Sequence, residues 1–187
     1  MKKTLLFLLV IALPFITFAQ SNIGFNGVGA RVGYVMPEGD IENTFGLGLN
    51  ADLGTITPTI SLEAFLDFWG KKYDSGTAGW EFSYTVTTIG AVGKYYFETS
   101  GDFEPYVGAG LGFEIASAKI TTPAYSYPGY TVPGTETTDS NTELAIILQG
   151  GATKQLSEKM DGFAEVKYVI SDIDYFGIYV GVMYKLK

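Results

Sequence analysis

Two carboxylates on one face of a predicted strand are the residues of this chain best suited to chemistry. Glu63 and Asp67 lie in a segment of alternating polar and apolar residues, so their side chains point to the same side. Glu114 falls in another such segment and could lie at a similar height. Paired carboxylates can act as general acid and general base. The chain has no histidine and no cysteine, which excludes a Ser-His-Asp triad, a histidine–metal site and thiol chemistry.

These carboxylates also have a structural interpretation, because other charged residues fall on the same predicted faces. The two signs nearly balance, the interior of a narrow barrel is filled by side chains, and buried charges must be paired. We therefore predict a salt-bridged lumenal network, and a selective pore or a catalytic site is the alternative. The predicted members are Arg31, Glu63, Asp67, Lys94, Glu114, Glu165, Lys167 and Lys185, with Asp52 as a further inward-facing anion. Arg31 and Glu63 are expected at similar depth, and no catalytic residue, metal ligand or cofactor is predicted.

The elements that position these residues are predicted to be strands. In the last one, Ile178, Val180 and Val182 fall on one face, and Tyr179 and Gly181 fall on the other. A strand between lipid and a polar, crowded lumen requires this pattern. Eight such segments can be marked, at residues 25–36, 45–53, 59–69, 80–97, 105–116, 143–155, 162–171 and 176–187.

The connections between these segments alternate in length. Long or polar stretches at residues 37–44, 70–79 and 119–142 alternate with short turns, and the final loop is also short. Outer-membrane barrels have short periplasmic turns and longer outer loops, and an even strand number places both chain ends on the periplasmic side. We therefore predict an all-β fold, an eight-stranded antiparallel up-and-down transmembrane β-barrel.

In two segments the sequence does not determine which side chains point into the lumen and which point outward. In residues 80–97 the apolar face changes between Val86 and Ile89, and a β-bulge near Thr87 and Thr88 would reconcile the two phases. Residues 145–148 are apolar on both faces, so alternation does not assign their sides.

The start of the chain is predicted to be a signal peptide. A basic start and an apolar stretch over residues 5–18 precede small residues that suit cleavage before Gln20. Residues 1–19 would then be removed, and residues 20–187 would form the barrel domain; an uncleaved membrane anchor is the alternative. The net charge of −8 and the lack of a basic patch argue against nucleic acid as a partner.

Two stretches carry a family resemblance. PYVGAGLGF at residues 105–113 resembles the recurrent fifth-strand phrase of small eight-stranded outer-membrane proteins, and KYYF at residues 94–97 fits the same pattern. The last strand resembles the C-terminal signal read by the barrel assembly machinery, through Tyr179, Gly181, Tyr184 and Leu186. That signal often ends on an aromatic residue, whereas this chain ends on a lysine. Over residues 20–187 the chain resembles the outer membrane protein beta-barrel domain family, which includes opacity-porin and OmpA-like proteins.

The resemblance implies a barrel in the outer membrane of a Gram-negative cell envelope. Its partners would be outer-membrane lipid, lipopolysaccharide and, during insertion, the barrel assembly machinery. It implies no single activity, because the family includes adhesins and structural anchors. A peptidoglycan-binding domain, which follows the barrel in longer OmpA-like proteins, is not expected here.

The predicted outer loops carry the other candidate features. Tyr125, Tyr127 and Tyr130 stand among Pro, Gly, Ser and Thr, which is how binding loops are often composed, so they form a candidate surface for a ligand or host partner. A mobile loop, or a polar hairpin that projects past the membrane, is the alternative. Three aromatic residues near the second loop are predicted to form an interfacial girdle: Trp69, Tyr73 and Trp80. Three acids in the first loop could hold a divalent cation but more simply solvate that loop: Glu38, Asp40 and Glu42.

We predict a monomeric integral outer-membrane β-barrel with a side-chain-filled polar lumen, a structural or surface-interacting role and no enzymatic activity. A narrow, porin-like channel for small or apolar solutes is the first alternative, and an enzyme in the lumen or loops is the second. A soluble secreted barrel or sandwich that binds a ligand is the third, but no amphipathic helix would cover its aliphatic outer face.

Overall fold

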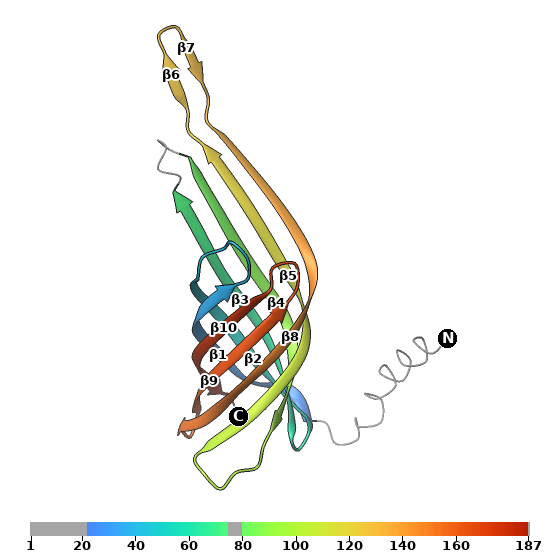
Figure 1. Cartoon of the computed structure of the whole chain (residues 1–187). Helices are drawn as coiled ribbons and strands as arrows, with labels where there is room; N and C mark the ends of the chain where they lie inside the picture. Colours follow the sequence, from blue (N-terminus) through green and yellow to red (C-terminus); the bar gives the residue numbers. More distant parts are fainter. Residues whose placement is uncertain (1–21, 75–79, 187) are drawn as a thin grey trace, which may run out of the picture.

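Eight strands close into an antiparallel β-barrel in the computed structural model, which describes residues 22–74 and 80–186 (Figure 1). The barrel strands are β1 (Asn22–Pro37), β2 (Thr44–Thr57), β3 (Ile60–Asp74), β4 (Glu81–Tyr96), β5 (Phe103–Thr122), β8 (Thr135–Ser157), β9 (Met160–Ile170) and β10 (Tyr175–Lys185). β1 pairs with β10 and closes the ring, so the predicted fold is confirmed. The predicted signal peptide, residues 1–19, lies outside the described residues.

Alternation sorts the side chains between the two faces of the barrel wall. On β1, Arg31 is 3% exposed whereas Val32 is 45% exposed, and on β2 the values are 2% for Asn50 and 57% for Leu49. The exposed face is rich in aliphatic and aromatic residues, which suits lipid. Ring closure pairs the backbone groups of each strand with both neighbours, as the bilayer core requires. No helix among the described residues is long and apolar enough to cross a membrane.

Each end of the barrel has its own connections. We call the end with the β1–β2, β3–β4, β5–β8 and β9–β10 connections the outer end, and the end where β1 begins and β10 ends the inner end. The inner end has the tight turns after β2 and β8, at residues 58–59 and 158–159.

An apolar layer fills the lumen on its outer side. Val35, Val86 and Ile147 are fully buried there, and the Trp69 ring packs edge to face against Tyr175 with centroids 5.6 Å apart. The prediction that Trp69 belongs to an interfacial girdle is wrong, because alternation along β3 turns its side chain into the lumen, where it is 1% exposed. Trp80, in contrast, is exposed.

β4 contains no bulge, so that prediction is wrong. Its pairing with β3 and with β5 continues without a register shift along the whole strand. The apolar residues change face because Phe82 and Tyr84 line a cavity at the outer end, whereas Ile89 points outward from the barrel wall. β8 is apolar on both faces for a related reason: Ala145 and Ile147 fill the apolar layer while the residues between and beside them face outward.

Four strands continue past the outer end of the others and form what we call the sheet extension (Figure 1). β5 and β8 stay paired up to Thr122 and Thr135, whereas β9 pairs with β8 only from Ile146 onward. β3 and β4 contribute shorter ends that pair up to Asp74 and Glu81. The predicted long loop is therefore mostly a polar hairpin, which is the alternative stated above.

A small two-stranded ribbon caps the sheet extension. β6 (Tyr125–Tyr127) and β7 (Tyr130–Val132) pair across Pro128 and Gly129, and Gly129 has a φ of 83°. A type II turn with proline followed by glycine requires such a positive φ at its third residue. The ribbon places Tyr125, Tyr127 and Tyr130 at the tip of the molecule.

Candidate functional site

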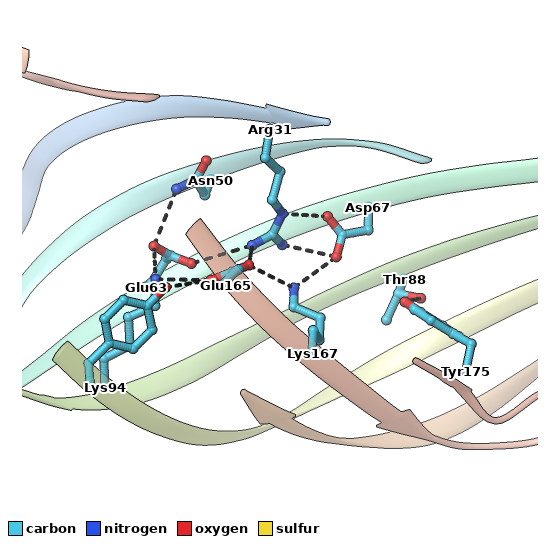
Figure 2. A network of polar contacts seen from close by, with 10 residues as sticks. Arg31, Asn50, Glu63, Asp67, Thr88, Lys94, Glu165, Lys167 and Tyr175 are labelled. Carbon is cyan, nitrogen blue, oxygen red and sulfur yellow. Dashed lines mark hydrogen bonds and ion pairs between the residues drawn. The ribbon is translucent and has the colours of Figure 1, made fainter. Parts of the chain in front are cut away.

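Six charged side chains from four strands meet in the middle of the lumen, and we call them the charged plug (Figure 2). Its members are Arg31 on β1, Glu63 and Asp67 on β3, Lys94 on β4, and Glu165 and Lys167 on β9. All six are buried. Three cations face three anions, so the plug carries no net formal charge.

Arg31 is the centre of the charged plug. Its Nε and Nη2 donate to the two carboxylate oxygens of Asp67, at 2.8 and 2.9 Å, and its Nη1 donates to Glu165 Oε1 at 2.6 Å. Glu63 lies farther away, with 3.8 Å between Arg31 Nη1 and Oε1. Paired hydrogen bonds of this kind fix the guanidinium in one orientation.

The two lysines complete the pairing of the anions. Lys94 Nζ donates to Glu63 Oε2 at 2.7 Å, and Lys167 Nζ donates to Asp67 Oδ2 at 2.9 Å. Both lysines also approach Glu165, at 3.7 and 3.9 Å. Every charge of the plug therefore has an opposite charge within hydrogen-bond distance, as a buried ion must have.

Aromatic rings and neutral polar groups enclose the charged plug. Tyr106 OH donates to Glu165 Oε2 at 2.7 Å, and Asn50 Nδ2 donates to Glu63 Oε2 at 3.2 Å. Lys167 Nζ lies 3.9 Å from the centroid of the Phe65 ring. Alternation could have identified these three residues as lumenal, since each follows the inward phase of its strand, but it could not have given their partners.

Two residues of the predicted network lie outside the plug. Glu114 is buried farther toward the outer end, where its Oε1 accepts the Ile173 N–H at 3.3 Å. Lys185 pairs with Asp161 at 2.7 Å at the inner end. The further predicted anion, Asp52, accepts the Gly54 N–H at 2.8 Å.

Two cavities lie on either side of the charged plug. The inner pocket, about 740 Å³, opens at the inner end and reaches Glu63 and Lys94. The mouth pocket, about 730 Å³, opens at the outer end between the β1–β2 connection, the ends of β3 and β4, and the β9–β10 connection. Neither lining includes Arg31, Asp67 or Lys167, so the plug separates the two pockets.

This arrangement leaves little scope for acid–base chemistry. Glu63 and Asp67, the candidate carboxylate pair, are each engaged by a lysine and by Arg31. A general acid or base must be free to exchange a proton with a substrate, and both of these carboxylates are engaged in ion pairs. Their geometry suits cross-linking of strands.

The other predicted residues lie at the two ends of the molecule. Tyr125, Tyr127 and Tyr130 are exposed at the tip, and the Tyr125 and Tyr127 rings make an edge contact at 5.8 Å. In the proposed assembly signal, Tyr179 is buried in the lumen, whereas Tyr184 and Leu186 point outward. Gly181 pairs with Arg31 on β1.

One family model matches this chain over nearly its whole length. Residues 4–185 match the model described as outer membrane protein beta-barrel domain. None of the curated protein sequences matches the chain.

Several solved structures share the fold. Neisserial surface protein A has a TM-score of 0.66 at 16% identity, with 86% of this chain and 97% of that chain covered. Ail of Yersinia pestis, in complex with the heparin analogue sucrose octasulfate, has a TM-score of 0.58 at 14% identity, covering 89% and 99%. A major outer membrane protein from Thermus thermophilus has a TM-score of 0.56 at 14% identity, covering 86% and 99%. Likeness at these identities establishes the fold alone.

Proposed function

Because this chain belongs to the outer membrane protein beta-barrel domain family, and is therefore a barrel of the outer membrane, we propose that it is a closed scaffold that presents the sheet extension to a partner protein. The observation that carries this proposal is the unequal length of β8 and β9. β8 begins at Thr135, but its pairing with β9 begins only at Ile146. Residues 135–145 of β8 thus have β5 on one side and no described strand on the other.

An unpaired strand edge is a template for binding. It offers a row of free N–H and C=O groups to which an extended segment of another protein can add as a further strand. The edge on β8 is held in place because β5 pairs with it along its whole length. Ser117 and Ser140 hydrogen-bond across that pair at 2.7 Å, and Lys119 pairs with Glu136 at 2.7 Å. A preorganised edge loses little entropy on binding.

The charge of the edge indicates which partner fits. Glu136, Asp139 and Glu143 lie within this stretch of β8, and only Glu136 has a cation among the described residues. Two such edges would repel each other, which disfavours pairing with a second copy and agrees with a monomer. A polyanion such as sucrose octasulfate, bound in the Ail structure, is also disfavoured. The partner we propose is an extended segment rich in lysine or arginine.

The lumen supports a scaffold role and argues against the channel alternative. The charged plug and the apolar layer stand between the mouth pocket and the inner pocket. Three of the contacts in the plug join strands that are not neighbours, β1 with β3, β1 with β9 and β3 with β9, whereas Lys94 and Glu63 join the adjacent strands β4 and β3. The same engagement of the carboxylates argues against an enzyme.

A peptide pair tests the proposed function. The first peptide alternates threonine and lysine, and the second has the same sequence with every backbone nitrogen methylated, which keeps the charge but removes the hydrogen-bond donors along both edges. With the full chain folded in detergent, fluorescence anisotropy should report binding of the first peptide and little binding of the second. Reversal of three charges, Glu136→Lys, Asp139→Lys and Glu143→Lys, should abolish binding of the first. Equal binding of both peptides, or of neither, would overturn strand addition.

A further inference from the structure

The mouth pocket has a lining that the scaffold role does not use. Four carboxylates face it: Glu38 and Asp40 from the β1–β2 connection, and Asp172 and Asp174 from the β9–β10 connection. The described residues that line this pocket include no lysine or arginine. A cavity of about 730 Å³ is within the range of small-molecule sites.

The negative charge of the mouth pocket is not balanced by its surroundings. The two lysines nearest in sequence to its β3 wall are engaged by other acids: Lys71 pairs with Glu42 and Lys72 with Glu81, each at 2.8 Å. No described ion pair involves any of the four carboxylates of the pocket. An added cation would therefore meet unneutralised charge.

The hydrogen bonds to these carboxylates come from neutral donors. Tyr168 OH donates to Glu38 Oε1 at 2.8 Å, and the Ser171 N–H donates to Asp174 Oδ1 at 2.9 Å. Such donors hold a carboxylate in position and leave its charge in place. Glu38 and Asp174 are thus oriented without being neutralised.

A buried acid, Glu114, lies next to the lining of the pocket. Glu114 is 1% exposed, and its Oε1 accepts the N–H of Ile173, which is part of the pocket lining. Glu114 forms no ion pair with the described residues, and its Oε2 has no hydrogen-bond partner among them. A buried acid without a cation is uncommon, since burial of an isolated charge is costly.

Aromatic rings form the opposite wall of the mouth pocket. Tyr73 lies near the end of β3, and Phe82 and Tyr84 lie near the start of β4. The Phe82 and Tyr84 rings meet edge to face at 4.8 Å, and Tyr73 lies 6.3 Å from Phe82. Aromatic faces attract weakly hydrated cations, and quaternary ammonium sites commonly use several rings. Carboxylates on one side and rings on the other are complementary to a cation with an apolar body.

Hydrogen bonds between the walls hold the pocket in one shape. The Glu38 N–H donates to the Asp174 carbonyl at 2.8 Å, which joins the two acidic connections. The Glu42 N–H donates to Tyr73 OH at 2.7 Å, which joins the first connection to the aromatic wall. The pocket is therefore a built site with three of its walls linked.

We propose that the mouth pocket binds a small organic ammonium ion. The alkylated nitrogen lies against the rings of Tyr73, Phe82 and Tyr84, and the carboxylates of the two connections neutralise its charge. A simple metal ion gains the charge attraction but not the contact with the rings, so an alkylated ammonium ion is favoured over a metal ion of equal charge.

Calorimetric titration of the folded full chain in detergent tests this proposal, with tetramethylammonium as the probe and sodium at equal ionic strength as the reference. Phe82→Ala removes part of the aromatic wall and Asp172→Asn removes one charge, and each should weaken binding by about tenfold. Two matched controls lie at the inner end, the exposed aromatic Phe103→Ala and the exposed acid Asp102→Asn, and both should leave binding unchanged.

Three results would overturn the ammonium site: no heat with wild-type protein, an unchanged affinity in Phe82→Ala, or equal losses in the two controls. Heat-dependent gel mobility of each variant establishes whether the barrel is folded, so that a lost site is separated from a lost fold. The titration does not use the β8 edge, so its outcome is independent of the peptide experiment.

Discussion

Arg31 and Asp67 form a doubly hydrogen-bonded ion pair over the backbone of a strand that lies between them. Arg31 on β1 is in register with Gly48 on β2, and Gly48 is in register with Asp67 on β3. The two side chains meet above Gly48 at 2.8 and 2.9 Å. A Cβ on residue 48 would overlap Asp67 Oδ1, so glycine is what lets the pair form.

Arg31→Ala should strongly destabilise the barrel. The substitution leaves Asp67 and Glu165 buried with less compensating charge, and removal of one partner from a buried pair costs about 3–5 kcal/mol. Urea unfolding of the protein in detergent measures the change. Lys119→Ala is the control, because its pair with Glu136 is exposed and such pairs contribute about 0–1 kcal/mol. Similar losses in the two variants would mean that the plug is not the source of stability.

Gly48→Ala should destabilise the barrel by about 1–3 kcal/mol, the usual cost of overpacking a filled core. The added methyl group would force the Asp67 carboxylate or the Arg31 side chain to move. Gly93→Ala is a matched control, since a Cβ at residue 93 would have no neighbour closer than 3.9 Å. The same urea titration compares both, and a neutral Gly48→Ala would contradict the packing described for this row of residues.

Wild-type protein should give no discrete conductance steps in a planar bilayer, because Trp69 and Tyr179 stand with the charged plug between the two pockets. Truncation of both layers, Trp69→Ala together with Arg31→Ala and Asp67→Ala, should connect the pockets and produce steps. Phe113→Ala on the exposed face is the control and should remain silent. Steps in the wild-type protein would support the channel alternative and would contradict the closed scaffold.

Most of the fold could be predicted from the alternation of polar and apolar residues. Side chains along a strand point to opposite faces in turn, and a barrel wall has one face toward the lumen and one toward lipid. The same rule assigned Arg31, Glu63 and Lys167 to the lumen, where the structure places them. It failed in residues 80–97, because Phe82 and Tyr84 face a cavity and not a packed lumen.

Features that depend on distances between strands could not be read from the sequence. Glu114 shares the inward phase of β5 but lies too far along the strand to reach the charged plug, and alternation does not report height. The free edge of β8 arises from the difference in length between β8 and β9. The mouth pocket needs two connections that meet only in the closed barrel, through Glu38 and Asp174.

Two variants, each with one arginine at a different height along β8, can locate the membrane along this strand. Leu148 points outward at the level of the charged plug, since the next residue, Gln149, pairs with Lys167. Leu148→Arg should lower the free energy of unfolding in lipid by about 2–4 kcal/mol, the cost of arginine near the bilayer midplane. Thr138→Arg, on the same face of β8 but within the sheet extension, should be nearly neutral because the side chain stays in water. Unfolding titrations in vesicles measure both variants. Equal costs at the two positions would mean that the sheet extension lies in lipid, and the β8 edge would then be closed to a soluble partner.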